Sequence, residues 1–325
     1  MAAAVPRPFP PGNGNLAKSR EKTSESGRDY LLTLTAARER EVLLRLGLFR
    51  SLNTSQLERF LLPESAVTAQ SRRVITKRLL RSLRKRGLVA PGTQLVGGPG
   101  GGSARLVYHL TDAGQRAAAF LDPTLSLRQS RRPGSLFVEH ALMCAEAALA
   151  FHDAARTHAG HELSEWVADW QIAELLGSSR VVPDALLTYS TRSWEFDAFV
   201  EVDLGSERPR RFAAKIAAYL DLYRRGAWRR RLRAWPLVLT IARSAARASA
   251  LKTATEELMR RERDAARLSR LEFDFAALPA LLGPEGPLGA IWQVAGREGL
   301  QRLVPDDVQE PTGDPRSTDA RRGAR

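Results

Sequence analysis

Residues 69–111 read AQSRRVITKRLLRSLRKRGLVAPGTQLVGGPGGGSARLVYHLT and carry the strongest local signals in the first part of the chain. Its apolar residues Ile75, Leu79 and Leu83 recur at helical spacing, which predicts a helix over 69–86 that ends at Gly87. Two apolar runs then flank a glycine-rich centre, as in a β-hairpin with a long tip. The stretch therefore predicts a helix followed by a hairpin.

The predicted helix has eight basic residues and no acid between Arg72 and Arg86. A solvated helix face usually mixes signs, because opposite charges at i,i+4 stabilise a helix. A stripe of one sign repels itself unless a polyanion compensates it, so we expect DNA here, with a plain surface helix as the alternative. Most contacts would be to phosphates. The candidate DNA-binding residues are Arg73, Lys77, Arg81, Arg84, Lys85 and, in the hairpin, Arg105.

Helices are also predicted on both sides of this stretch. Thr35 can cap a helix through AAREREVLLRLGLF, Ser55 and Glu58 have capping-box spacing, and Thr111 can cap DAGQRAAAFL. Three helices, a hairpin and a closing helix resemble the winged-helix fold, which often ends with a segment such as YHLTDAG at 108–114. The resemblance implies a recognition helix in the major groove, with the hairpin over the phosphates.

In the second half of the chain, helix and strand patterns alternate. Residues 136–155 predict a long amphipathic helix. Strands are then predicted over 163–173, 181–189 and 195–204. A helix over 210–225 and a last strand over 235–242 follow.

Three acids gather on these predicted strands. Glu201 and Asp203 are two residues apart, so they share one face, and a hairpin could bring Asp184 beside them. Three carboxylates repel one another unless a cation lies among them, and hard oxygen ligands suit Mg²⁺ or Mn²⁺. Lys215, on the next helix, could then orient an attacking water. A solvated strand face opposite arginines is the alternative interpretation.

This order of elements over roughly 136–245 resembles the PD-(D/E)xK nuclease superfamily, with its restriction-endonuclease-like fold. The matching residues are Pro183-Asp184, Glu201-Val202-Asp203 and Lys215-x-x-x-Tyr219. The resemblance implies that Asp184 and Glu201 bind the metal and that Glu139 or His140, on the leading helix, could join them. With the third acid of the strands, the predicted metal ligands are Asp184, Glu201 and Asp203, and the predicted catalytic residues are these three with Lys215 and Tyr219. The superfamily's catalytic lysine stands two residues after the glutamate, where this chain has Asp203. Either Lys215 replaces that lysine, or the chemistry is lost and only binding remains.

The whole chain resembles the replication-relaxation family of bacterial plasmids and integrative elements. The residues that carry this resemblance are Glu201-Val202-Asp203, Lys215, Tyr219 and His140 on the leading helix. The resemblance implies a role in initiating or supporting the replication or mobilisation of mobile DNA.

These patterns predict an α/β (α+β) protein, in which an N-terminal winged helix is followed by a restriction-endonuclease-like domain with a mixed sheet. The predicted parts are a disordered arm over 1–28, the winged-helix domain over 29–121, a linker over 122–135, the nuclease-like domain over 136–303 and a disordered tail over 304–325.

Composition supports a DNA partner and a cytoplasmic location. The 325 residues suffice for two domains, and a net charge of +14 favours polyanions. The single cysteine, Cys144, excludes an intramolecular disulfide and is expected in the core. The N-terminal segment lacks the apolar run of a signal peptide, and no apolar run could span a bilayer, so we expect no membrane partner.

Three functions stay open at this point. The first is a Mg²⁺-dependent DNA endonuclease or nickase, and the second is a non-catalytic accessory factor that works with replication or relaxase proteins. The third is a transcription regulator.

Arginines and tryptophans at 224–235 suit either nucleic acid or a packed core, and Arg243 and Arg247 extend the positive rim. His158 and His161 have the spacing of a metal pair, but their polar surroundings favour a loop.

Overall fold

The computed structural model describes residues 37–304, apart from 63–67, 93–105, 126–133, 178, 206–208, 231, 263–267 and 269–270. The chain divides into two compact units, 1–145 and 146–325, and the division falls within helix α6 (Ser135–Thr157). The predicted N-terminal arm, Thr35, Arg105 and most of the predicted linker and tail lie outside the described residues. Within the described ranges, no helix combines the length and hydrophobicity that crossing a bilayer requires.

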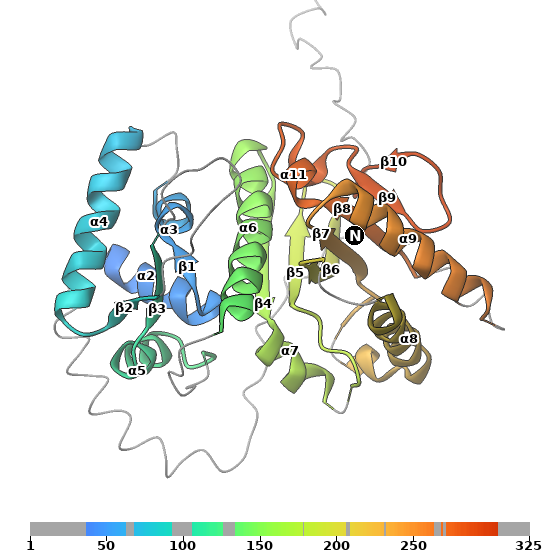
Figure 1. Ribbon diagram of the computed structural model, residues 1–325, viewed down its shortest axis with the longest axis horizontal. Helices are drawn as coiled ribbons and strands as arrows, with labels where there is room; N and C mark the ends of the chain where they lie inside the picture. Colours follow the sequence, from blue (N-terminus) through green and yellow to red (C-terminus); the bar gives the residue numbers. More distant parts are fainter. Residues whose placement is uncertain are drawn as a thin grey trace, which may run out of the picture. The chain divides into compact units, whose positions relative to one another are not determined.

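The first unit contains short helices around a small sheet (Figure 1). Its three strands form an antiparallel sheet in the order β1-β3-β2. In chain order the elements are α2 (Ala37–Phe49), β1 (Leu52–Asn53), α3 (Thr54–Leu61), α4 (Ala69–Lys85), β2 (Val89–Pro91), β3 (Val107–Leu110) and α5 (Asp112–Leu121). Apart from the short β1, this is the order of helices and hairpin that the sequence predicts.

Helix α4 confirms the prediction of a helix over 69–86. Thr68 caps it, because its hydroxyl accepts a hydrogen bond from the backbone of Ser71 at 3.3 Å. The helix ends where Gly87 takes a φ of +68°, a conformation that favours glycine. Its inward face buries Thr76, Leu80 and Leu83 against the core of the unit.

The start of α3 differs from the predicted capping box of Ser55 and Glu58. Asn53 is the cap, and its side chain accepts from the backbone of Gln56 at 3.0 Å. The Gln56 side chain in turn accepts from the Asn53 backbone at 3.0 Å. Asn and Gln perform the same reciprocal exchange as Ser and Glu, so the helix starts two residues earlier than predicted.

The second unit is built on a mixed sheet of seven strands, in the order β10-β9-β8-β7-β6-β5-β4. The pairs β6–β7 and β7–β8 are parallel, and the other neighbours are antiparallel. Its strands are β4 (Glu162–Ala168), β5 (Ala185–Ser190), β6 (Glu195–Asp203), β7 (Leu237–Ala242), β8 (Phe273–Ala277), β9 (Trp292–Val294) and β10 (Leu300–Gln301).

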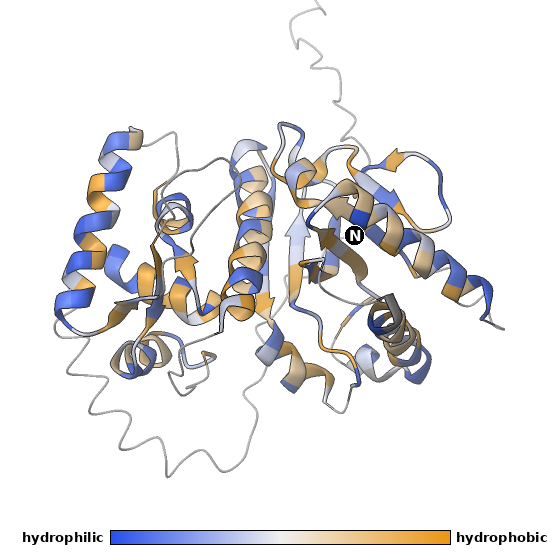
Figure 2. Ribbon diagram, viewed as in Figure 1, coloured by the Kyte–Doolittle hydropathy of each residue, from blue (hydrophilic) through white to orange (hydrophobic). Residues whose placement is uncertain are grey.

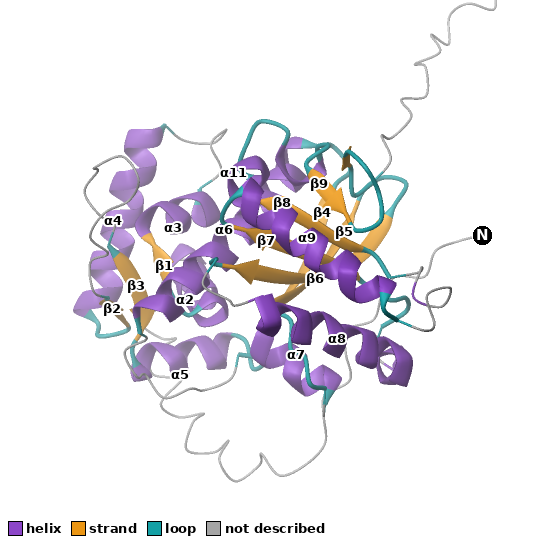
Figure 3. Cartoon of the chain, turned by 45° about the vertical axis from the view of Figure 1, so that its right-hand side comes forward, coloured by secondary structure: helices purple, strands orange, loops and turns teal. Residues whose placement is uncertain are grey.

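Two crossover helices, α8 (Pro209–Arg225) and α9 (Ala245–Arg260), cover one face of this sheet (Figure 3). That face buries Phe199, Phe212, Tyr219, Phe273 and Phe275 in one cluster. Strands β7 and β8 are buried along nearly their whole length and β6 is buried over its last six residues, which is the usual state of parallel strands. Figure 2 shows hydrophobic residues concentrated in these strands, whereas hydrophilic residues predominate along α4.

One predicted strand and the end of the domain differ from expectation. The strand predicted over 163–173 stops at Ala168, and α7 (Asp169–Leu176) begins there because the Gln171 side chain accepts from the Ala168 backbone at 3.0 Å. No individual helices or strands were predicted beyond residue 242. The structure places α9, β8, α11 (Leu278–Leu281), the short 3-10 helix η2 (Gly286–Leu288), β9 and β10 there.

Candidate functional site

A buried acid, Glu201, forms the centre of the candidate site. It lies in β6 with only 2% of its surface exposed. Lys215 and Tyr219, one turn apart on α8, both donate to it. The Tyr219 hydroxyl lies 2.5 Å from Oε1, and the Lys215 ammonium lies 2.8 Å from Oε2. The spacing of four residues on α8 therefore places two donors over one carboxylate.

Burial changes the acid–base behaviour of this cluster. Burial and the charge of Asp184 together raise the pKa of Glu201 to about 7, even though Lys215 and Tyr219 act to lower it. The pKa of Tyr219 is raised well above its usual value by burial and by the charge of Glu201. Tyr219 therefore acts as a hydrogen-bond donor in this cluster and keeps its proton.

Asp184 comes beside Glu201 through the β5–β6 hairpin, as the sequence predicted. Ala185 pairs with Val200 in the antiparallel register, and the Asp184 backbone donates to the Val200 carbonyl at 3.0 Å. One Asp184 oxygen, Oδ2, accepts from the backbone of Val202 at 2.8 Å. The aspartate is thus fixed at the entrance to β5, close enough to Glu201 to shift its pKa.

Asp203 is part of a different contact. Arg247, on α9, donates to Oδ1 at 2.8 Å and to Oδ2 at 2.9 Å, and the Gly205 backbone also donates to Oδ1. Asp203 is 5% exposed, so this two-pronged ion pair is largely shielded from solvent. Asp203 shares a sheet face with Glu201, but an arginine neutralises it.

The arrangement separates the predicted trio of acids into a pair and a single residue. In the described part of the chain, the oxygens of Asp184, Glu201 and Asp203 do not all lie within 4.8 Å of one another. Asp184 and Glu201 are the oxygen donors of the type that Mg²⁺ or Mn²⁺ binds. Both oxygens of Asp203 accept from Arg247, and the two oxygens of Glu201 accept from Tyr219 and Lys215.

The residues predicted to bind DNA gather on one face of α4. Arg73, Lys77, Arg81, Arg84 and Lys85 are all exposed, as is Arg78 between them. Arg86, at the end of the helix, points elsewhere: it donates to the buried acid Glu39 of α2 at 3.0 Å. Ser82 also donates to Glu39, at 2.8 Å. These two bonds fix α4 against α2 and leave the exposed cations on the outer face.

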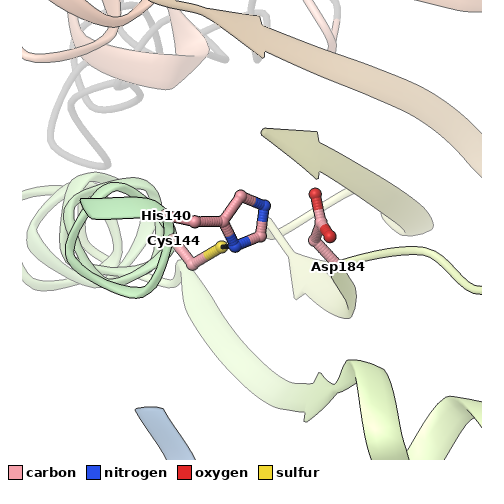
Figure 4. Close-up of side chains that lie close together, drawn as sticks. All are labelled: His140, Cys144 and Asp184. Carbon is pink, nitrogen blue, oxygen red and sulfur yellow. Dashed lines mark hydrogen bonds between the residues drawn. The ribbon is translucent and has the colours of Figure 1, made fainter. Parts of the chain in front are cut away.

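Other residues singled out by the sequence make contacts with their neighbours. His140 and Cys144 lie one turn apart on α6, with Nδ1 and Sγ 3.7 Å apart; Figure 4 draws them together with Asp184. Cys144 is half-buried, not fully in the core as predicted. Trp228 and Trp235 pack on each other and on Tyr223. His161 contacts the Tyr189 hydroxyl, and His158 contacts the Ala154 carbonyl.

Three residues that matter here were missed from the sequence or given another role. Arg247 was expected only to extend a positive rim, although the capping residue Ser244 and the position of Arg247 in the first turn of α9 place it at the end of β7. Glu39 is the buried acid of α2, and Asp274 is a buried acid of β8 with 1% exposure. An acid within an apolar run, such as FDFAA at 273–277, was the available signal for Asp274.

The comparison with protein families covers both units. A family model described as replication-relaxation matches residues 43–238, which include α4, Glu201, Lys215 and Tyr219. No curated protein and no solved structure matches the chain. The family match spans more than half of the 325 residues. This chain therefore belongs to the replication-relaxation family.

Proposed function

We propose that this protein binds double-stranded DNA through a winged-helix first unit and supports the replication or mobilisation of mobile DNA in the cytoplasm. Membership of the replication-relaxation family supports the biological role. The observation that carries the DNA proposal is the outer face of α4, on which every exposed charged residue is basic. Replication or relaxase proteins are the proposed further partners.

The geometry of α4 suits a duplex. The exposed residues Lys77, Arg81 and Arg84 follow one another at spacings of four and three, so they form a line along one side of the helix. An α-helix fits into the major groove, whose rims carry the phosphates that such a line of cations would contact. The Glu39 contacts to Ser82 and Arg86 hold the opposite side of the helix in place.

Salt-dependent binding of duplex DNA tests this proposal. We expect the variant Lys77→Glu with Arg81→Glu to lose most of its affinity at low salt. The slope of log affinity against log salt should fall by about 0.9 for each lost phosphate contact. The matched control reverses two exposed arginines at the end of α9, Arg260→Glu with Arg261→Glu, and so changes the net charge equally. Equal losses in both variants would reject α4 as the DNA-binding face.

A second candidate function is divalent-metal-dependent DNA cleavage, as an endonuclease or nickase. One observation favours it: Asp184 and Glu201 lie near each other, with the Lys215 ammonium 2.8 Å from Glu201. Two adjacent carboxylates are the usual protein contribution to a Mg²⁺ site, and the bound ion supplies charge that activates water. Lys215 and Tyr219 would position the Glu201 carboxylate.

Supercoiled plasmid incubated with Mg²⁺ or Mn²⁺ distinguishes the two candidates. Cleavage predicts nicked or linear product from the wild-type protein and none from Asp184→Ala with Glu201→Ala. Retained duplex binding by that variant would show that its first unit is folded. Intact plasmid with the wild-type protein under both ions would leave the non-catalytic accessory role, and product from the double variant would exclude these two acids.

A further inference from the structure

The outer face of α4 is not uniformly charged. Gln70 and Val74 are both exposed, and they are uncharged residues within its first two turns. Val74 keeps 38% of its surface exposed, whereas Leu80 and Leu83 on the inner face are at or below 2%. From Lys77 onward the exposed residues of the helix are all cationic. The face therefore consists of an uncharged N-terminal part and a basic C-terminal part.

Gln70 and Val74 lie together along the middle of this face. They are four residues apart, so their side chains are neighbours on the helix surface. The next neighbours of Val74 in the same direction, at three and four residues, are Lys77 and Arg78. Arg73 is exposed to one side. The apolar side chain thus lies within a ring of cations and does not contribute to the core.

The position of these two residues within the helix is well defined. Thr68 accepts from the Ser71 backbone at 3.3 Å, and its hydroxyl donates to the Ser71 hydroxyl at 3.0 Å. This cap fixes the first turn, from which Gln70 extends. Side chains near the N-terminus of a helix in the major groove are the ones that reach base edges, while later turns contact the backbone.

We propose, building on the DNA-binding function proposed above, that Gln70 and Val74 read neighbouring A·T base pairs in the major groove. A glutamine amide matches the N6 donor and N7 acceptor of adenine, and a valine side chain matches the C5 methyl group of thymine. Lys77, Arg78 and Arg81 hold the adjacent phosphates. The inference assigns sequence readout to the uncharged part of the face and affinity to the charged part.

The proposal is tested on a site selected from a random duplex library by the full-length protein. Thymines of the selected site are replaced one at a time by deoxyuridine, which lacks only the methyl group. Adenines are replaced one at a time by 7-deazaadenine, which lacks the N7 acceptor. Wild-type affinity should fall about fourfold at one thymine, the value of one buried methyl-sized group, and by a similar factor at one nearby adenine.

Two variants identify the residues responsible. Val74→Ala should bind the thymine and deoxyuridine duplexes equally, and Gln70→Ala should bind the adenine and 7-deazaadenine duplexes equally. The control Lys85→Ala should weaken binding to every duplex by the same factor and keep both base effects. Base effects that persist in Val74→Ala and Gln70→Ala would overturn the inference, as would selection that yields no preferred sequence. If no duplex binds at any salt concentration, the DNA-binding function itself fails instead.

Discussion

Arg247 and Asp203 form a two-pronged ion pair, with Nε 2.8 Å from Oδ1 and an η-nitrogen 2.9 Å from Oδ2. It joins the first turn of α9 to the end of β6, across the intervening strand β7. The pair neutralises Asp203, one of the three acids that the sequence suggested as metal ligands. Among the described residues, Arg247 is the cation that neutralises the buried Asp203 carboxylate.

We expect Arg247→Ala to lower the free energy of unfolding by about 3 to 5 kcal/mol, because it leaves a buried carboxylate without its partner. Urea denaturation measures the loss. Arg243→Ala is the matched control: Arg243 is an exposed arginine four residues earlier, and its removal should cost far less. Adding Asp203→Asn to Arg247→Ala should restore part of the stability. A double variant no more stable than Arg247→Ala would contradict this account.

The hydrogen bond from Tyr219 to Glu201 is tested by removing one oxygen atom. Tyr219→Phe should cost about 1 to 3 kcal/mol, since a buried acceptor loses its donor. Tyr223→Phe makes the same chemical change one turn later on α8. In the described part of the chain the Tyr223 hydroxyl has no hydrogen-bond partner, so we expect little change there. Thermal unfolding of both variants gives the comparison, and equal losses would show that the hydroxyl contact is not the cause.

Asp274 makes the stability of the second unit depend on pH. Neither of its oxygens has a hydrogen-bond partner among the described residues, and burial, with the charge of Glu272, raises its pKa well above the usual value. The unfolded chain releases this proton at lower pH than the folded chain, so stability falls as pH rises through this interval. Glu201, with its pKa of about 7, contributes in the same direction.

We therefore expect Asp274→Asn to gain stability relative to wild type as pH rises from 5 to 8. The gain should reach at least about 1.4 kcal/mol, the value of one pKa unit. Urea unfolding at several pH values measures it. Glu298→Gln, which neutralises an exposed acid, should show no such trend. A constant difference between Asp274→Asn and wild type at every pH would exclude ionisation as the cause.

Gly114 allows α5 to approach β2 closely. A Cβ atom at this position would lie 1.9 Å from the Leu88 carbonyl oxygen, a backbone atom that cannot easily move. Gly114→Ala should therefore destabilise the first unit by about 1 to 3 kcal/mol or more. Gly134→Ala adds the same methyl group where nothing lies within 4 Å, and it should be nearly neutral. Circular dichroism melts of both proteins make the comparison.

Local signals in the sequence were sufficient for much of the fold. The helical spacing of Leu79 and Leu83 and the stop at Gly87 predicted α4, and the apolar run around Glu201 predicted β6. The strand predicted through 173 was too long, because an apolar segment such as Trp170–Ile172 fits a buried helix as well as a strand. The capping residue of α3 was missed because the true pair, Asn53 and Gln56, has the same spacing as the predicted pair, Ser55 and Glu58.

The candidate site was predicted in part. Hairpin pairing brought Asp184 beside Glu201, and helical spacing brought Lys215 and Tyr219 to the same carboxylate. The partner of Asp203 could not be deduced, because Arg247 arrives from a crossover helix 44 residues later. Long-range contacts of this kind depend on strand order, and a single sequence does not specify the order β8-β7-β6.

Strand β8 pairs with β7 along its length and so covers what would otherwise be an open row of backbone groups. A truncated protein that stops after β7 would expose that row to other chains, which invites aggregation. It would also lack Arg247 and leave Asp203 buried without a counter-charge. Fragments made to study the second unit should therefore continue past Val294, the last residue of β9, so that β8 keeps both of its neighbours.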